Sequence, residues 1–139
     1  MSDFLTQILI EIIDPAVRGT LSLLRSASLP SASTIKRVVL TGSTNAIRTV
    51  TTSGVFDESS WSDAPALVEE ATRNGTLSAV SPDVVYSASK ALAEKAAWEF
   101  WENEKGKEGG VGWDLAVLTP PFIYGVCISP AYRALSLTH

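Results

Sequence analysis

The chain has a single cysteine and a single histidine among its 139 residues, Cys127 and His139. One cysteine cannot form an internal disulfide, and we see no metal ligands at a suggestive spacing from it. Because the only histidine is the last residue, we expect neither a Ser-His-Asp triad nor a histidine metal cluster, and we predict no bound metal. Catalysis by this chain would have to use tyrosine, lysine and serine together with a cofactor.

Positive charge is also scarce, with 11 lysines and arginines against 15 acidic residues and a net charge of −4. Such a balance offers nucleic acid or an anionic membrane little electrostatic attraction. No run approaches the ~20 apolar residues that cross a bilayer. Asp3 and Glu11 interrupt the apolar stretch at the N-terminus, which is unlike a signal peptide. We therefore expect a cytoplasmic protein that binds neither nucleic acid nor a membrane.

Hydrophobic patterning predicts alternating helices and strands. Two short apolar runs, 35–41 and 113–119, predict buried strands. Apolar residues at helical spacing predict helices over 2–13, 16–27 and 64–74, and a further helix after Pro82 that includes 88–101. Pro15 either starts the second helix or kinks a continuous one. The length is that of one ordinary domain.

A tyrosine and a lysine lie four residues apart near the start of the last helix, Tyr86 and Lys90. This spacing places them on one helix face, one turn apart. An ammonium group beside a phenol stabilises the phenolate, which equips the tyrosine for general acid/base catalysis. The same spacing on an ordinary surface helix also packs a phenol against a lysine stem, so this alternative stays open.

Ser43 follows the first predicted strand, within Leu40-Thr41-Gly42-Ser43-Thr44. The strand places the Ser43 hydroxyl at the C-terminal edge of a sheet, where ligands bind in open α/β folds. Without further context Ser43 could equally be an ordinary turn serine.

Four segments carry a resemblance to a known family: "RVVLTGST" at 37–44, "VFDESSWSD" at 55–63, "VVYSASKALAEKAAWEF" at 84–100 and "DLAVLTPPFIYG" at 114–125. In this order they resemble the extended short-chain dehydrogenase/reductase family, its epimerase/dehydratase-like and dihydroflavonol-reductase-like branch. The resemblance implies an α/β fold, namely the central portion of a Rossmann-like doubly wound parallel sheet. It implies that residues 1–139 form a single incomplete NAD(P)-binding domain.

The resemblance also implies residue roles. Tyr86 would donate the proton, Lys90 would tune the tyrosine and hold the nicotinamide ribose, and Ser43 would hydrogen-bond the substrate carbonyl. Gly42 stands where many relatives have a serine. Substrate contacts are expected from Thr44 and from Trp61, although a half-buried packing role suits Trp61 as well. Cofactor contacts are expected from Thr41, Tyr86, Lys90, Pro120, Phe122 and Ile123.

A glycine-rich stretch at 106–112 has the spacing G-x-x-G-x-x-G of a phosphate-binding loop. Such a loop must follow a strand and open a helix, so that the helix N-terminus meets the phosphates. Here the glycines follow a helix and enter a strand. We therefore interpret them as a helix stop and a loop.

These observations predict a truncated NAD(P)H-dependent carbonyl reductase that lacks the family's glycine-rich loop and its C-terminal substrate region. We expect a small-molecule carbonyl substrate, NADP in preference to NAD, and cofactor binding weakened by the missing loop. Three alternatives remain: a non-catalytic fragment that acts at most through helix-mediated association, an epimerase or dehydratase acting on a nucleotide sugar, and an unrelated small α/β binding module. We expect any homodimer to form through the N-terminal helix and the Tyr86 helix. Unpaired strand edges predict poor stability alone or self-association.

Overall fold

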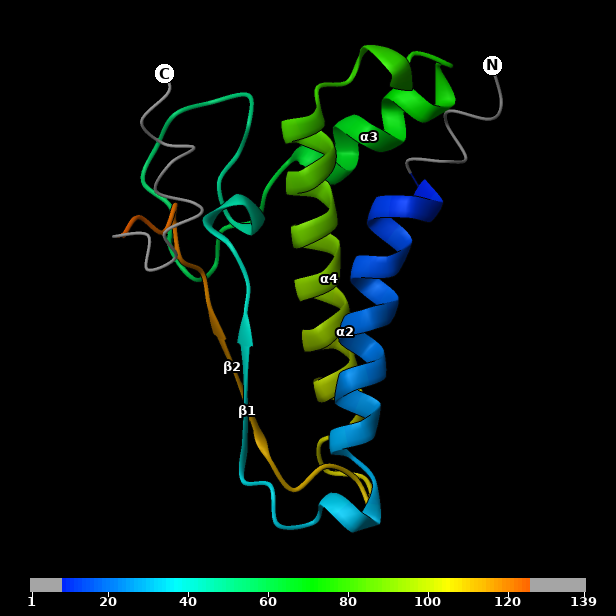
Figure 1. Ribbon diagram of the computed structural model, residues 1–139, viewed down its shortest axis with the longest axis vertical. Coiled ribbons are helices and arrows are strands. Elements are labelled where there is room, and N and C mark those ends of the chain that lie inside the picture. The colour runs from blue at the N-terminus through cyan, green and yellow to red at the C-terminus, as the bar shows by residue number, and fades with distance from the viewer. Residues whose placement is uncertain (1–8, 126–139) are drawn as a thin grey trace, which may run out of the picture.

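Helices cover one side of a two-stranded sheet in the computed structural model of the chain, which describes residues 9–125 (Figure 1). The long elements in chain order are α2 (Asp14–Ala27), β1 (Arg37–Thr41), α3 (Ala64–Arg73), α4 (Pro82–Glu104) and β2 (Asp114–Leu118). Short helical turns occur at η1 (Leu9–Ile13), η2 (Pro30–Ala32), η3 (Thr44–Ala46) and η4 (Leu77–Ala79). Residues 2–8 of the first expected helix lie outside the described range.

The two strands are parallel, and their register runs from Arg37 opposite Asp114 to Thr41 opposite Leu118. Parallel strands require a crossover, and α4 forms part of it. The structure corrects one prediction, because the strands are half-buried rather than buried. Val39 is 54% exposed and Leu118 is 58% exposed, since the described helices cover one face of the sheet only.

The two long helices, α2 and α4, lie side by side and run in the same direction (Figure 1). Leu24 of α2 is almost fully buried in a cluster with Ala97 of α4, with Leu115 of β2 and with Trp113, which precedes that strand. Alanines on α4 that are entirely inaccessible to solvent allow the close approach: Ala88, Ala91 and Ala97. Small side chains therefore set the depth at which α4 lies in the fold.

The helix ends follow from local sequence. Pro15 lies in the first turn of α2, where its missing N–H costs nothing, and η1 leads directly into that helix. Ser81 caps α4 by accepting a hydrogen bond from the backbone N–H of Val84, at 3.4 Å. Gly106 and Gly109 have positive φ after α4, so the glycine stretch is a loop between a helix and a strand, as expected.

Replacing Leu24 with alanine tests the contact between the helices. Because the side chain is 1% exposed, Leu24→Ala should lower the free energy of unfolding by about 2–5 kcal/mol. Urea titration followed by circular dichroism measures this difference. Leu29→Ala, which truncates an exposed leucine, should change it by less than about 0.5 kcal/mol. Equal effects of the two substitutions would contradict the described packing.

Candidate active site

A pocket of about 320 Å³ opens where β1 and β2 end, at the carboxyl edge of the parallel sheet. Ligands bind at this edge in open α/β folds. The lining comes from the turn after β1, from α4 and from the loop after β2: Thr41, Gly42, Ser43, Thr44, Asn45, Tyr86, Pro120, Pro121, Phe122 and Ile123. Ser43 and Tyr86, which are distant in sequence, thus share one cavity.

The turn that carries Ser43 is fixed by backbone hydrogen bonds to the chain leaving β2. The N–H of Gly42 donates to the carbonyl of Leu118 at 2.7 Å, and the N–H of Thr44 donates to the carbonyl of Pro120 at 3.2 Å. Ser43 is the N-cap of η3, and its Oγ accepts a hydrogen bond from the N–H of Asn45 at 3.2 Å. That bond uses an oxygen lone pair, which leaves the hydroxyl hydrogen to donate to a ligand.

Tyr86 lies in the second turn of α4, with 44% of its surface exposed and its side chain lining the pocket. The Nζ of Lys90 lies 5.7 Å from the centroid of the Tyr86 ring, within the range of a cation–π contact. Lys90 contacts the ring without lining the pocket. The structure therefore joins the predicted Tyr86–Lys90 pair, and it brings Tyr86 but not Lys90 to the cavity beside Ser43.

The loop after β2 forms an apolar wall. Pro120, Pro121, Phe122 and Ile123 line the pocket, and Phe122 and Ile123 are each 85% exposed. The ring of Phe122 lies 6.1 Å from that of Tyr124, centroid to centroid. Contiguous exposed apolar side chains are typical of a surface that a ligand or another protein segment covers.

Trp61 lies apart from this pocket. The Nζ of Lys95 sits 5.0 Å from the centroid of its ring, and the half-buried indole is not among the lining residues. The pocket therefore includes Thr44, as predicted for substrate contact, without Trp61. The packing alternative fits the position of Trp61 better.

Asp63 fastens the loop that leads from η3 to α3. Its Oδ1 accepts a hydrogen bond from the N–H of Val50 at 2.7 Å, and its Oδ2 accepts one from the Thr51 hydroxyl. Burial alone would raise the pKa of Asp63, but these hydrogen bonds outweigh it and hold the pKa below its ordinary value. The sequence did not predict these contacts, because Asp63 is 13 positions from Val50 and 12 positions from Thr51.

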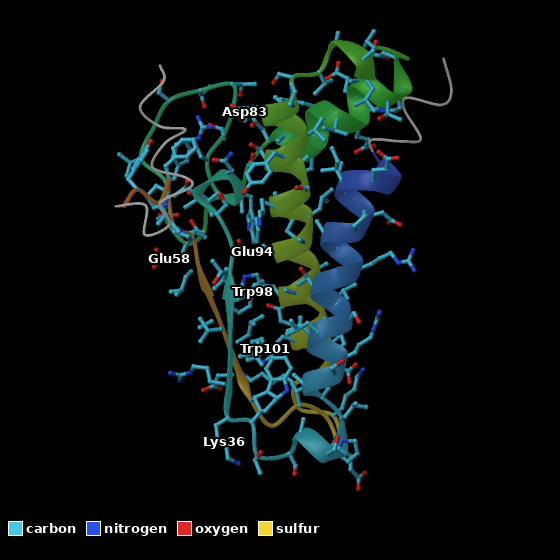
Figure 2. The ribbon with its side chains drawn as sticks, viewed as in Figure 1. Lys36, Glu58, Asp83, Glu94, Trp98 and Trp101 are labelled. Atoms are coloured by element: carbon cyan, nitrogen blue, oxygen red, sulfur yellow. The ribbon has the colours of Figure 1, made fainter. Side chains whose placement is uncertain are left out.

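Glu94 of α4 is a buried acid that the sequence analysis did not single out. It is 6% exposed, and its Oε2 has no hydrogen-bond partner among the residues described. Figure 2 shows Glu94 and Trp98 on the side of α4 that faces β1. Burial raises the pKa of Glu94 above its ordinary value of 4.5, and a hydrogen bond from Trp98 opposes the shift. The sequence signal that could have identified Glu94 is its position four residues after Lys90, on the same face of the helix.

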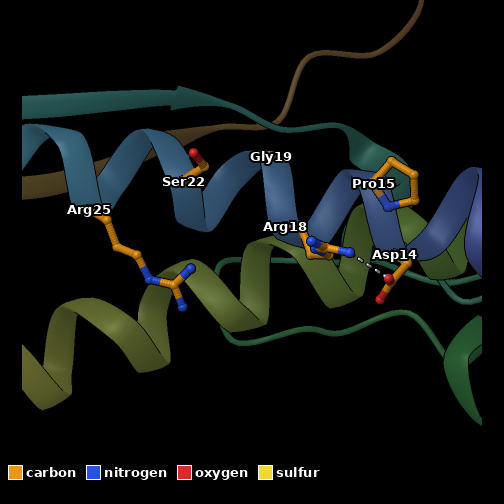
Figure 3. Close-up of a pocket in the computed structure, with 6 residues that line it drawn as sticks. All are labelled: Asp14, Pro15, Arg18, Gly19, Ser22 and Arg25. Carbon is orange, nitrogen blue, oxygen red and sulfur yellow. Dashed lines mark ion pairs between the residues drawn. The ribbon is translucent and has the colours of Figure 1, made fainter.

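A larger hollow of about 520 Å³ runs along α2, away from Ser43 and Tyr86 (Figure 3). It is shallow and polar, and Arg18 pairs with Asp14 in it at 3.6 Å. It is lined by Asp14, Pro15, Arg18, Gly19, Ser22 and Arg25. Because its charges lie on one exposed helix face, we assign it no chemistry. Within residues 9–125 no cluster of three potential metal ligands occurs.

The lining of the smaller pocket suits part of a nicotinamide dinucleotide. Apolar side chains of the β2 loop offer a face for a flat ring, and the hydroxyl-bearing turn after β1 offers hydrogen bonds. The volume is at the lower end of the range for ligand sites, which is about 300–1,000 Å³. In the described part of the chain, no glycine-rich loop joins a strand to the N-terminus of an α-helix, since the turn after β1 has one glycine, Gly42, and leads into the three-residue helix η3.

Comparison with known proteins gives a consistent picture. No protein-family model matches the chain. The chain is 39% identical to the ketoreductase azaE of Aspergillus niger over 83% of its own length and 30% of that protein. It is 33% identical to dihydroflavonol 4-reductase of Callistephus chinensis, over 92% of the chain and 30% of that protein.

The yeast methylglyoxal/isovaleraldehyde reductase Gre2, solved in complex with NADPH, superposes with a TM-score of 0.70 at 31% identity. The match covers 88% of the chain and 33% of Gre2. The superposition therefore gives the chain part of the fold of the Rossmann-fold reductases that it matches.

More narrowly, the chain belongs to the extended short-chain dehydrogenase/reductase family, in its dihydroflavonol-reductase-like branch. It spans about a third of the length of the curated relatives that it matches. No helix within residues 9–125 is long and apolar enough to cross a membrane.

The buried carboxyl group gives a pH-dependent prediction. An acid whose pKa is raised by folding stabilises the fold below its unfolded pKa, and this contribution is lost as pH rises through the folded pKa. Relative to Glu94→Gln, the wild-type chain should therefore lose stability over the range in which the pH rises above 4.5, the ordinary pKa of this group. Urea midpoints measured across this range test it. Glu99→Gln, at an exposed position of the same helix, should show no such slope. Parallel curves for wild type and Glu94→Gln would refute the assignment.

Proposed function

We propose that this chain carries the catalytic segment of an NADPH-dependent carbonyl reductase. The observation that supports the proposal is the shared pocket of the Ser43 hydroxyl and the Tyr86 phenol, with the Lys90 ammonium beside the tyrosine ring. A hydroxyl donor and a phenol that face one cavity can both reach the oxygen of a bound carbonyl. The homologous reductases make this chemistry the natural assignment.

The residues divide the work as follows. The Ser43 hydroxyl donates a hydrogen bond to the carbonyl oxygen and orients it. A bound nicotinamide dinucleotide supplies the hydride. Tyr86 gives its phenolic proton to the same oxygen, so the carbonyl becomes an alcohol and the tyrosine becomes a phenolate. The Lys90 ammonium stabilises that negative charge, which falls on the ring it already contacts.

The cofactor contacts follow from the position of each residue. Phe122, Ile123 and Pro120 form the apolar side of the pocket, where a nicotinamide ring would lie, and Thr41 closes the strand end. We expect Lys90, whose ammonium lies beside the Tyr86 ring, to hydrogen-bond the ribose hydroxyls of the bound nucleotide. NADPH is the favoured dinucleotide because the yeast Gre2 structure contains it. The described residues form a pocket for the nicotinamide half of the dinucleotide only, so we expect this chain alone to bind NADPH weakly.

The substrate that we propose is a small aldehyde or ketone. A pocket of about 320 Å³ that must also accommodate a nicotinamide leaves room for a few heavy atoms. The relative named as a methylglyoxal/isovaleraldehyde reductase takes substrates of this size, and the Aspergillus relative is named a ketoreductase. The chemistry shared by these names is carbonyl reduction.

Dinucleotide binding and turnover test the proposal together. NADPH fluorescence titration should detect a complex, and methylglyoxal with NADPH should give slow turnover. Tyr86→Phe should remove the proton donor, so turnover should fall by about 10²-fold or more while NADPH affinity stays within about threefold. Absence of binding to both NADPH and NADH would end the enzyme proposal for this chain. Turnover that survives Tyr86→Phe would show that another residue donates the proton.

A second candidate function is association without catalysis. Ile12 and Leu23 are exposed, large and apolar, and they are eleven positions apart, so they lie on nearly the same face of the helical segment η1–α2. We propose that these two side chains are contacts for a second helix. The proposed arrangement is a homodimer through the N-terminal helices.

Placing a charge at position 23 tests the proposed homodimer. Leu23→Glu should convert a concentration-dependent dimer into a monomer because a carboxylate would be buried in the apolar interface. Sedimentation equilibrium over a hundredfold range of protein concentration measures the change. Val39→Lys, on the uncovered sheet face, is the matched control for association through the sheet. A wild-type chain that is monomeric throughout would exclude the dimer.

A further inference from the structure

One face of α4 carries three functional groups in a row. Tyr86, Lys90 and Glu94 are spaced four residues apart, so their side chains form a single ridge along the helix. Tyr86 reaches the pocket and Lys90 contacts its ring. Glu94, the third member, is buried between α4 and β1 (Figure 2). The proposed reaction uses the first two members and leaves the third unexplained.

Glu94 meets the chain at the residue immediately before Ser43. A Cβ atom built on Gly42 would lie 3.0 Å from Glu94 Oε2, 3.1 Å from Val117 Cγ1 and 3.3 Å from the carbonyl oxygen of Leu118. Gly42 does not have a positive φ, so its backbone conformation does not demand glycine. The space that a side chain at position 42 would occupy is bounded by the carboxyl group.

The Ser43 turn is bonded to the chain on one side and has Glu94 as a neighbour on the other. On the β2 side, backbone hydrogen bonds from Gly42 and Thr44 fix it to Leu118 and Pro120. On the helix side, Glu94 Oε2 borders the space that a Cβ atom on Gly42 would fill. The Glu94 side chain belongs to the same helix face as Tyr86 and is buried on the side of α4 that faces β1.

We infer that Glu94 is a positioning residue that fixes the Ser43 turn relative to α4, and that its unpartnered oxygen is a receptor for a hydroxyl at position 42. This inference deepens the proposed function, since it concerns how Ser43 is aligned with Tyr86. A buried carboxyl oxygen without a partner is costly, so a donor placed beside it should be favourable. A serine at position 42 would supply that donor once Glu94 Oε2, Val117 Cγ1 and the carbonyl oxygen of Leu118 each yield by a few tenths of an ångström.

Amide hydrogen exchange, measured by NMR without cofactor or substrate, tests the positioning role. Glu94→Ala should speed exchange of the Gly42 and Thr44 amides by about tenfold relative to the amides of β1, because the turn loses its support on one side. Glu94→Gln keeps the shape and should restore exchange to within about threefold of wild type. Glu99→Ala, an exposed glutamate on the same helix, should change nothing.

Substitution at position 42 tests whether Glu94 Oε2 accepts a hydrogen bond from a hydroxyl there. Gly42→Ser should raise the urea midpoint relative to Gly42→Ala, because both add a Cβ but only serine can donate to Glu94. In a Glu94→Ala background this advantage should vanish, which makes the pair a double-mutant cycle. Frequencies of the carboxyl stretch in infrared spectra should shift with Gly42→Ser and not with Gly42→Ala.

Three results would overturn the inference. The first is a uniform increase of exchange throughout the chain in Glu94→Ala, which would indicate general destabilisation. The second is no change at Gly42 and Thr44. The third is a serine advantage that persists without Glu94. Because these measurements need no dinucleotide, they can fail while NADPH binding succeeds, and they can succeed while it fails.

Discussion

The close approach of α4 to its neighbours is the constraint on which the rest of the structure depends. Ala97 packs in the cluster that contains Leu24 of α2 and Leu115 of β2, and Ala88 packs in the cluster that contains Val68 of α3, so these small side chains do not hold the helix away from its neighbours. This depth brings Tyr86 to the carboxyl edge of the sheet, where the Ser43 turn lies. It also forces Glu94 into the interior, where one carboxyl oxygen stays unpartnered among the described residues. The small side chains of α4 therefore determine both how the helix packs and where Tyr86 and Glu94 lie.

Much of the architecture could be predicted because it is encoded locally. The β-branched run before Thr41, the proline at the start of α4 and the glycines after that helix each determine their own element, and all three agree with the structure. Their order implied a parallel arrangement, which the strand register confirms. The exposure of Val39 could not be inferred in the same way, because alternation along a strand does not say whether a second layer covers the other face.

The site was predictable to the same extent. Ser43 and Tyr86 were predicted from a strand end and a helix start together with the family resemblance, and the structure brings both residues to one pocket. Trp61 was harder, since a tryptophan in a loop serves packing and binding equally well, and its contact with Lys95 joins two distant segments. Glu94 was missed for a related reason. A glutamate in a helix pattern looks like a solvated residue, and only tertiary packing shows that it is buried.

The apolar loop after β2 has a thermodynamic consequence. Phe122, Ile123 and Tyr124 present their side chains to water, and each loses that hydration when anything is laid over the loop. Complex formation at this rim would then carry a negative heat-capacity change, with an enthalpy that becomes more favourable on warming. Part of the binding free energy of any ligand at this loop would therefore come from burial of apolar surface and would not depend on hydrogen bonds. That part would vary with temperature.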